Sequence, residues 1–381
     1  MKVVFAIDSF KGSLSSADAG RAAAAGFSKV FPNADTVVLP VADGGEGTTD
    51  ALTAGLGGTL CKVNVTGPVG ETVTASYGIL ADGVTCIMEM ASAAGLPLVP
   101  VEKRDPMHMT TYGVGEMIRD AVLHGCRKFI IGIGGSATND CGIGMLSALG
   151  FVFKDAAGNV LSKGAADLGR IASISQDNIL PEIGECSFNI ACDVTNPLCG
   201  QFGCSKIFAP QKGASANDVT VMDGYFAAFA SLVKTYYPES DKDHPGSGAA
   251  GGLGYAFRTF LGGVLTPGVE LVLDAVGLGE HLKDCDVVFT GEGRLDSQTV
   301  MGKAPAGVAD EGKKYGVPVI AVAGCIGDGA GICNEHGISA FFPILRTVTT
   351  AEDAMKPENA ASNMVSTVEQ IARLIKTFGK I

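Results

Sequence analysis

Short apolar runs alternate with helical patterns at the N-terminal end of the chain. Residues 2–7 predict a buried strand, and the alanine-rich stretch at residues 15–30 predicts the helix that follows it. Residues 36–40 predict a second strand, and residues 48–54 predict a second helix. This alternation is typical of a parallel sheet with helices on both faces.

The same alternation returns near the C-terminus. Apolar runs at residues 286–290, 317–322 and 340–345 predict three further strands. Helices are expected at residues 303–315 and, as one long final element, at residues 351–378. Both ends of the chain therefore predict α/β structure.

The middle of the chain has a different texture. Residues 64–90 predict antiparallel strands, with turn signals at Gly67-Pro68 and Asp82-Gly83. Further helices are expected near residues 115–124 and 142–149, and further strands at residues 129–133 and 188–192.

A chain of 381 residues suits about two domains. We expect residues 1–65 and 284–381 to form one α/β domain, with residues 66–283 inserted as a second, mixed α/β domain and the active site in the cleft between them. Two consecutive domains are also compatible with the sequence.

Composition limits the class of protein. The net charge of −12, without a basic run, argues against a nucleic-acid partner. No apolar stretch of roughly 18 residues predicts a membrane span, and Asp8 interrupts any signal-peptide core, so we expect a cytoplasmic protein without a membrane partner. The 11 cysteines are scattered and only 5 histidines occur, which favours reduced thiols in the core over a zinc site.

Polar, glycine-bearing segments follow several predicted strands, where open α/β sheets bind ligands. Asp8, Ser9 and Lys11 follow the first strand, although the first two could simply cap the next helix. Asp43 and Glu46 follow the second strand among glycines and could hold Mg²⁺ through water.

Two loops of the middle region are further candidates. The segment GIGGSATND suits phosphate binding by main-chain N–H groups and hydroxyls, although its G-x-G-x-x-A spacing also permits a dinucleotide fold. Asp193 is a candidate general base or an Asx-turn residue before Pro197, and Lys212 is a candidate phosphate ligand. The predicted nucleotide-binding residues are Gly134, Gly135, Ser136, Thr138, Asn139, Gln211, Lys212 and Lys303.

The segment TGEGRLDSQTVMGK fails as a P-loop, because Ser297 replaces the first glycine and Ala304 follows Lys303. Its acids suit metal or hydroxyl contacts, Arg294 suits a clamp on a carboxylate, and Lys303 suits phosphate, unless all of them form surface ion pairs. Acids for a metal, cations for anions and glycine loops together indicate phosphoryl transfer to a small anion.

The chain resembles the bacterial glycerate kinase family, type 1, in segments that run nearly end to end. They include DSFKGSLSS, PVADGGEGT, GIGGSATND, ACDVTNPLCG, FAPQKGA and TGEGRLDSQTVMGKAPAGVA. The resemblance implies ATP-dependent phosphorylation of D-glycerate, usually to 2-phosphoglycerate, in organic-acid catabolism, and a flavodoxin-like domain made from both chain ends. Ile7 and Cys141 depart from the expected proline and glycine, and Cys141 could add oxidation sensitivity.

The expected roles follow from chemistry. Asp193 would act as the base, with Lys11, Arg294 and Asp296 as the other catalytic residues. Substrate would contact Asp8, Ser9, Asp43, Arg294 and Gln298, and Mg²⁺ would be held by some of Asp43, Glu46, Glu292 and Asp296. An NAD-dependent hydroxy-acid dehydrogenase and a non-catalytic sugar-acid sensor remain alternatives, and the acceptor hydroxyl and the oligomeric state stay open.

Overall fold

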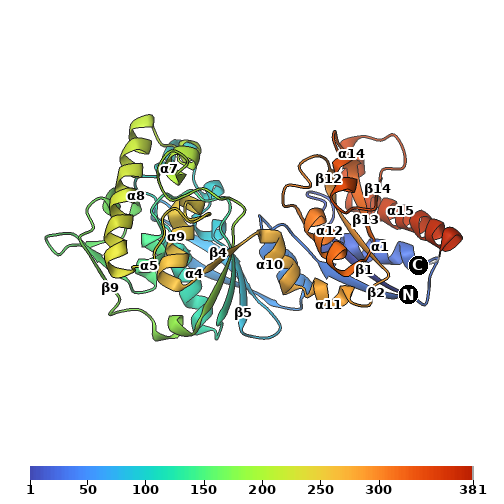
Figure 1. The fold of residues 1–381 in the computed structure, drawn as a ribbon, viewed down its shortest axis with the longest axis horizontal. Helices are drawn as coiled ribbons and strands as arrows, with labels where there is room; N and C mark the ends of the chain where they lie inside the picture. The colour runs from blue at the N-terminus through green and yellow to red at the C-terminus, as the bar shows by residue number, and fades with distance from the viewer. Residues whose placement is uncertain (380–381) are drawn as a thin grey trace. The chain divides into compact units, whose positions relative to one another are not determined.

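The computed structural model describes residues 1–379, which divide into two compact units (Figure 1). Unit 1 comprises residues 1–43, 54–56 and 269–381, apart from the last two residues, and unit 2 comprises residues 44–53 and 57–268. Both units are α/β, as the sequence predicted.

Unit 1 is built on a parallel five-stranded sheet within the described residues, in the order β14-β13-β12-β1-β2. Numbered by their order along unit 1, these strands run 2-1-3-4-5, which is the flavodoxin-like order. The strands are β1 (Lys2–Ile7), β2 (Asp35–Pro40), β12 (Val287–Leu295), β13 (Val319–Ile326) and β14 (Ala340–Pro343).

Helices cover both faces of this sheet. Phe5, Phe27 and Phe289 meet in the core on one face, with stacked and edge-to-face rings, and helices α1 and α15 pack there. The alternate residue Val288 faces the other side, where Gly312 of α12 lies against it. The helices are α1 (Ser16–Ser28), α10 (Gly268–Ala275), α11 (Leu278–Leu282), α12 (Ala304–Tyr315), α13 (Ile332–Glu335), α14 (Ala351–Met355) and α15 (Pro357–Phe378).

The single final helix predicted from the sequence is wrong. It breaks at Lys356, whose ψ of 129° is extended, and α15 then starts at Pro357. Proline disfavours the helical conformation of the residue before it, which accounts for the break.

Unit 2 contains, within the described residues, a mixed six-stranded sheet in the order β11-β10-β6-β5-β4-β3. Strands β3, β4 and β5 pair antiparallel, as predicted, and β5, β6, β10 and β11 are parallel. The strands are β3 (Thr59–Thr66), β4 (Thr72–Ile79), β5 (Thr85–Glu89), β6 (Lys128–Gly132), β10 (Ser187–Ala191) and β11 (Val264–Thr266), with a small antiparallel sheet of β7 (Val152–Lys154), β8 (Val160–Leu161) and β9 (Ser173–Ser175).

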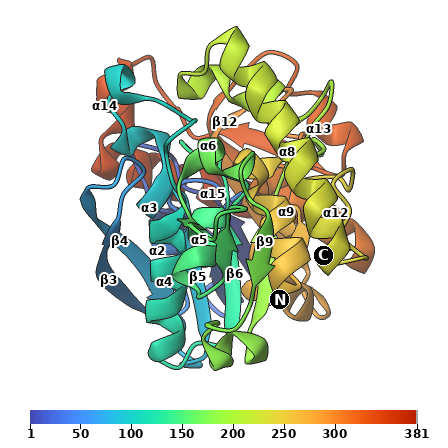
Figure 2. The ribbon, with the colours of Figure 1, turned by 90° about the vertical axis from the view of Figure 1, so that its left-hand side faces the viewer.

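Helices pack against this sheet (Figure 2), and a large apolar core lies between the two layers. Strand β3 belongs to this sheet, although the sequence placed residues 57–65 in the first domain. The helices are α2 (Thr48–Gly55), which crosses the boundary of the units, and α3 (Ala91–Ala94), α4 (Tyr112–Leu123), α5 (Ile143–Ala148), α6 (Gly164–Leu168), α7 (Cys204–Phe208), α8 (Ala216–Tyr236) and α9 (Ala249–Leu261).

Among the residues that the structure describes, no helix combines the length and the apolar character that a bilayer-crossing segment needs. All eleven cysteines are free thiols, and most of them are buried or half-buried, as expected for small core residues.

Candidate functional site

The first candidate site is a pocket of about 680 Å³ in unit 1, which we call the Asp8 pocket. It lies where β1 and β12 end, since Asp8 follows β1 and Asp296 follows β12. It brings together most of the charged residues that the sequence singled out in unit 1. The polar predicted residues in its lining are Asp8, Ser9, Lys11, Asp43, Glu292, Arg294, Asp296, Gln298 and Lys303.

Strand β12 positions two of these groups. It continues to Leu295, five residues beyond the predicted end, so Glu292 and Arg294 lie on a strand that pairs with Ala323 and Cys325 of β13. Because side chains alternate along a strand, Glu292 and Arg294 share one face. The sequence did not predict the second half of this strand because Gly291 and Gly293 interrupt its apolar pattern, and glycine is depleted in strands.

Both cations of this segment are paired with acids. Lys303 Nζ lies 3.3 Å from Glu292 Oε2, and Thr299 Oγ1 donates to Glu292 Oε1 at 2.7 Å. Arg294 Nε lies 3.2 Å from Asp296 Oδ2, with the guanidinium exposed. Glu292 is buried, so the first pair is partly shielded from water, whereas the second lies at the surface.

Two carboxyl groups of this pocket, those of Asp8 and Glu292, have raised pKa values. Burial, together with the negative charges of Asp43 and Glu292, raises the pKa of Asp8 to about 7, although the hydrogen bond from the Ser9 N–H lowers it. Burial also raises the pKa of Glu292, opposed by Thr299 and Lys303. A bound cation would stabilise the ionised form of carboxyl groups that lie this close together.

An apolar surface completes the Asp8 pocket. It comes from the end of β14, from α14 and from the first turns of α15, and no sequence motif marked it. The side chains are Ile344, Leu345, Ala351, Ala354, Met355 and Ala360. The only sequence signal for this arrangement is Pro357, because the chain turns there between two helices that both line the pocket.

The second candidate site is a pocket of about 240 Å³ in unit 2, which we call the Lys212 pocket. It is lined by glycine loops and by Asp193, Gln211 and Lys212, together with Ser136. Gly134 and Gly135 are exposed in its lining, so their main chain is accessible.

Lys212 is the most unusual residue of this pocket. Its side chain is 1 % exposed, and Nζ donates to Ser136 Oγ and to the carbonyl oxygen of Thr138, both at 2.7 Å. Neither partner is a carboxylate, and burial lowers the Lys212 pKa to about 8. A buried ammonium held by neutral oxygens suits an anionic ligand.

Thr138 and Asn139 are fully buried and do not line the Lys212 pocket. Asn139 Nδ2 donates to Ser205 Oγ at 3.1 Å, inside unit 2. The next residue, Asp140, which the sequence analysis did not single out, accepts from the Thr111 N–H and hydroxyl at 2.8 Å each and from Gly142 N–H at 3.0 Å. Asp140 therefore fixes the loop from within.

Asp193 is exposed and also lines the Lys212 pocket, and its Oδ1 accepts from the Gly268 N–H at 2.9 Å. Gly44 packs closely against the same Gly268: its φ is +86°, and a Cβ there would lie 2.6 Å from the Gly268 Cα. Glu46, by contrast, is an exposed residue of unit 2 and does not line the Asp8 pocket, where Asp43 lies.

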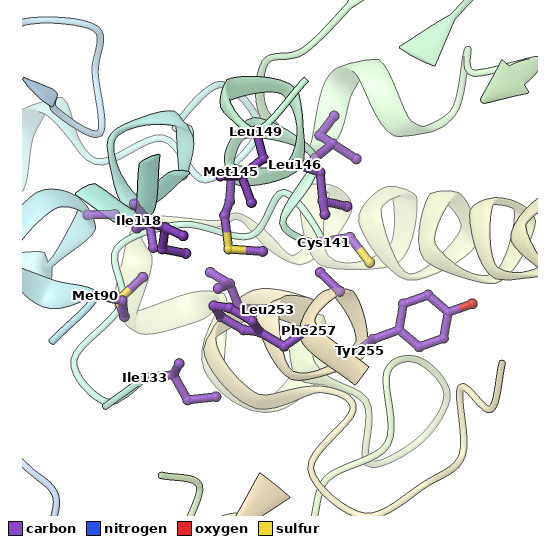
Figure 3. Packing of buried hydrophobic residues seen from close by; sticks show 14 of the residues in the cluster. Met90, Ile118, Ile133, Cys141, Met145, Leu146, Leu149, Leu253, Tyr255 and Phe257 are labelled. Atoms are coloured by element: carbon purple, nitrogen blue, oxygen red, sulfur yellow. The ribbon is translucent and has the colours of Figure 1, made fainter. Parts of the chain in front are cut away.

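Cys141 lies in the core of unit 2, near Leu146 and Tyr255 (Figure 3). It is fully buried, and burial raises the pKa of its thiol well above the ordinary value. The oxidation sensitivity expected of it is therefore wrong, because a buried neutral thiol is a poor nucleophile. Its φ of 51° explains why a glycine suits this position.

Comparison with known proteins shows which family the chain resembles. The model of the glycerate kinase family matches residues 3–376. The chain is 48 % identical to glycerate 2-kinase of Escherichia coli (strain K12), over 93 % of both chains, and 44 % identical to glycerate kinase of Haemophilus influenzae, over 98 % of this chain and 99 % of that one. A crystal structure described as glycerate kinase 2 from Salmonella typhimurium LT2 superposes with a TM-score of 0.90 at 43 % identity, covering 99 % of this chain and 98 % of that one.

The relatives are named as kinases, which places the chain among the enzymes of the phosphotransferase class, and the acids and cations at the strand ends of unit 1 are compatible with that chemistry. The chain belongs to the glycerate kinase family. The dehydrogenase alternative is not favoured, since the matching relatives are named as kinases.

Proposed function

We propose that the protein transfers the γ-phosphoryl group of ATP to D-glycerate, giving 2-phosphoglycerate in organic-acid catabolism. One observation carries the proposal beyond family membership: the Asp8 pocket gathers acids and cations around one cavity. Phosphoryl transfer depends chiefly on positioning and charge stabilisation, and this set of side chains can supply both.

Mg²⁺ could bind at the Asp8 pocket through a few carboxylates together with the phosphates of ATP. Within residues 1–379 no group of three or more His, Cys, Asp or Glu side chains is arranged to hold a metal ion, so the protein offers no complete cage. Mg²⁺ commonly binds through one or two carboxylates and the substrate phosphates, and keeps several waters. Asp43, Glu292 and Asp296 are the candidate carboxylates, and Glu46 is the fourth predicted from the sequence. When bound, the ion would neutralise charge on the phosphates.

The cations have complementary roles in this proposal. Lys303 is half-buried and Lys11 and Arg294 are exposed in the Asp8 pocket, where they can reach anionic groups of a ligand. Arg294 suits a two-pronged contact with a carboxylate or a phosphate. In the Lys212 pocket, the Lys212 ammonium and the main chain of Gly134 and Gly135 offer donors to an anion.

Asp193 is the proposed base. Its Oδ1 is oriented by the Gly268 N–H, which fixes the direction from which the carboxylate can take the proton of an attacking hydroxyl. In the reaction the hydroxyl oxygen bonds to the γ-phosphorus, the bond to the ADP oxygen breaks, and the hydroxyl proton passes to Asp193.

The test is an ADP-release assay on purified protein with Mg-ATP, comparing D-glycerate with L-glycerate, lactate and no acid. The proposal expects ADP release that depends on D-glycerate. ADP release at the same rate without glycerate would identify an ATPase instead. In a parallel reaction with NAD in place of ATP, glycerate-dependent reduction of NAD would support the dehydrogenase.

A further inference from the structure

We infer that the Asp8 pocket is the nucleotide site, with the phosphates at its charged end and the adenine on the apolar surface formed by β14, α14 and α15. The inference rests on the proposed function, which requires ATP. It places the nucleotide in unit 1, whereas the sequence directed the nucleotide phosphates mainly to the glycine loop at residues 134–139 of unit 2.

Sheet topology is the first reason. In open α/β sheets the ligand crevice lies outside the carboxyl ends of the strands where the strand order reverses, which in the 2-1-3-4-5 order falls between the first and third strands. In unit 1 these strands are β1 and β12, and the Asp8 pocket lies at their ends. The sheet of unit 2 places its strands in sequential order and has no such reversal.

Size is the second reason. Pockets for ligands of nucleotide size measure about 300–1,000 Å³. The Asp8 pocket, at about 680 Å³, lies within this range, whereas the Lys212 pocket, at about 240 Å³, lies below it. The larger pocket can accept a base, a ribose and phosphates together.

The separation of charged from apolar side chains within the pocket is the third reason. The ends of β1 and β12 supply the acids and cations, and α14 and α15 supply small and apolar side chains. Leu345 and Met355 are 39 % and 46 % exposed, which is high for large apolar residues, so a flat ring that covered them would remove apolar surface from water. Alanines at positions 351, 354 and 360 leave room for that ring.

Asn363 is the polar residue placed to orient the base. It follows Ala360 by three positions on α15, so both face the same side of the helix, and both line the pocket. Its amide provides a donor and an acceptor, which matches the edge of an adenine.

A steric variant tests the apolar end through kinetics. Ala354→Phe fills the space proposed for the base, and we expect the KM for ATP to rise about tenfold or more while the KM for glycerate stays within about twofold of wild type. The matched control is Ala25→Phe, at an exposed alanine of α1 in the same unit that does not line the pocket. The control should keep both KM values.

A binding measurement tests the same point without turnover. The chain contains no tryptophan, so Met355→Trp introduces a single indole, which can be excited selectively over the 7 tyrosines, at the apolar end. ADP should quench or shift its emission because adenine stacks on the indole, whereas inorganic tripolyphosphate, which lacks a base, should leave the emission unchanged. The emission of the control variant Ala25→Trp should respond to neither.

The outcomes separate this inference from the proposed function. If wild type phosphorylates glycerate but Ala354→Phe keeps its KM for ATP and the emission of Met355→Trp ignores ADP, the nucleotide binds elsewhere and the inference is wrong. If wild type makes no phosphate ester, the proposed function fails, and the ADP titration of Met355→Trp still decides whether the pocket binds a nucleotide.

Discussion

The carboxyl group of Asp8 should destabilise the folded protein at neutral pH. Burial and the neighbouring charges of Asp43 and Glu292 raise its pKa from 3.8 to about 7. A carboxyl group whose pKa is higher in the folded state binds its proton more tightly there than in the unfolded chain. The contribution of Asp8 to the free energy of unfolding therefore falls as the pH rises from about 4 to about 7. Above that range this contribution stays constant.

The size of the effect follows from the shift. A difference of about 3 pKa units corresponds to about 4 kcal/mol at 1.36 kcal/mol per unit. Asp8→Asn has nearly the same shape and keeps an oxygen for the Ser9 N–H, now 2.6 Å from Oδ1, but carries no charge. We expect this variant to be more stable than wild type by roughly 2–4 kcal/mol at pH 8 and equally stable near pH 4.

The assay is urea unfolding followed by circular dichroism at pH 4.5, 6, 7 and 8, in EDTA so that no divalent ion binds the acids. Asp310→Asn, at an exposed position on α12, is the control and should follow wild type at every pH. A stability difference between Asp8→Asn and wild type that is the same at pH 4.5 and pH 8 would refute the reasoning, because the effect must come from the charge.

Two further predictions concern the Lys212 pocket. Asp193→Asn keeps an oxygen that accepts from the Gly268 N–H but loses the basic carboxylate. Turnover should therefore fall by about 10²–10⁴, while glycerate binding measured by calorimetry stays near wild type. Near-normal turnover would exclude Asp193 as the base. Because burial lowers the Lys212 pKa to about 8, kcat/KM for glycerate should fall as the pH rises through that value. Lys212→Met should lose activity at every pH. A wild-type kcat/KM that stays constant up to pH 9.5 would contradict a role for the ammonium.

The sequence predicted the α/β class and most strands because their apolar runs are short and bounded by polar loops. It also predicted the charged residues of the Asp8 pocket, since Asp8 and Asp43 follow buried strands and Glu292 follows the apolar run that begins β12. Residues at strand ends converge in a parallel sheet, so this part of the site can be predicted from order along the chain.

Other parts depend on contacts that no local pattern encodes. The apolar end of the Asp8 pocket is formed by α14 and α15, which look like one helix until the effect of Pro357 on Lys356 is weighed. Likewise, Thr138 and Asn139 resemble phosphate ligands in sequence, but the structure turns them inward, where Asp140 anchors the loop. Which face of a loop meets solvent is decided by such distant partners.

Phosphorylation of glycerate can be observed by ³¹P NMR of the protein incubated with Mg-ATP and D-glycerate, beside a reaction without glycerate. We expect a new phosphate ester that appears only with glycerate and whose ³¹P signal is split into a doublet by one proton, as in 2-phosphoglycerate. A triplet would show transfer to the terminal hydroxyl and correct the product. No ester, with ATP intact, would contradict the account.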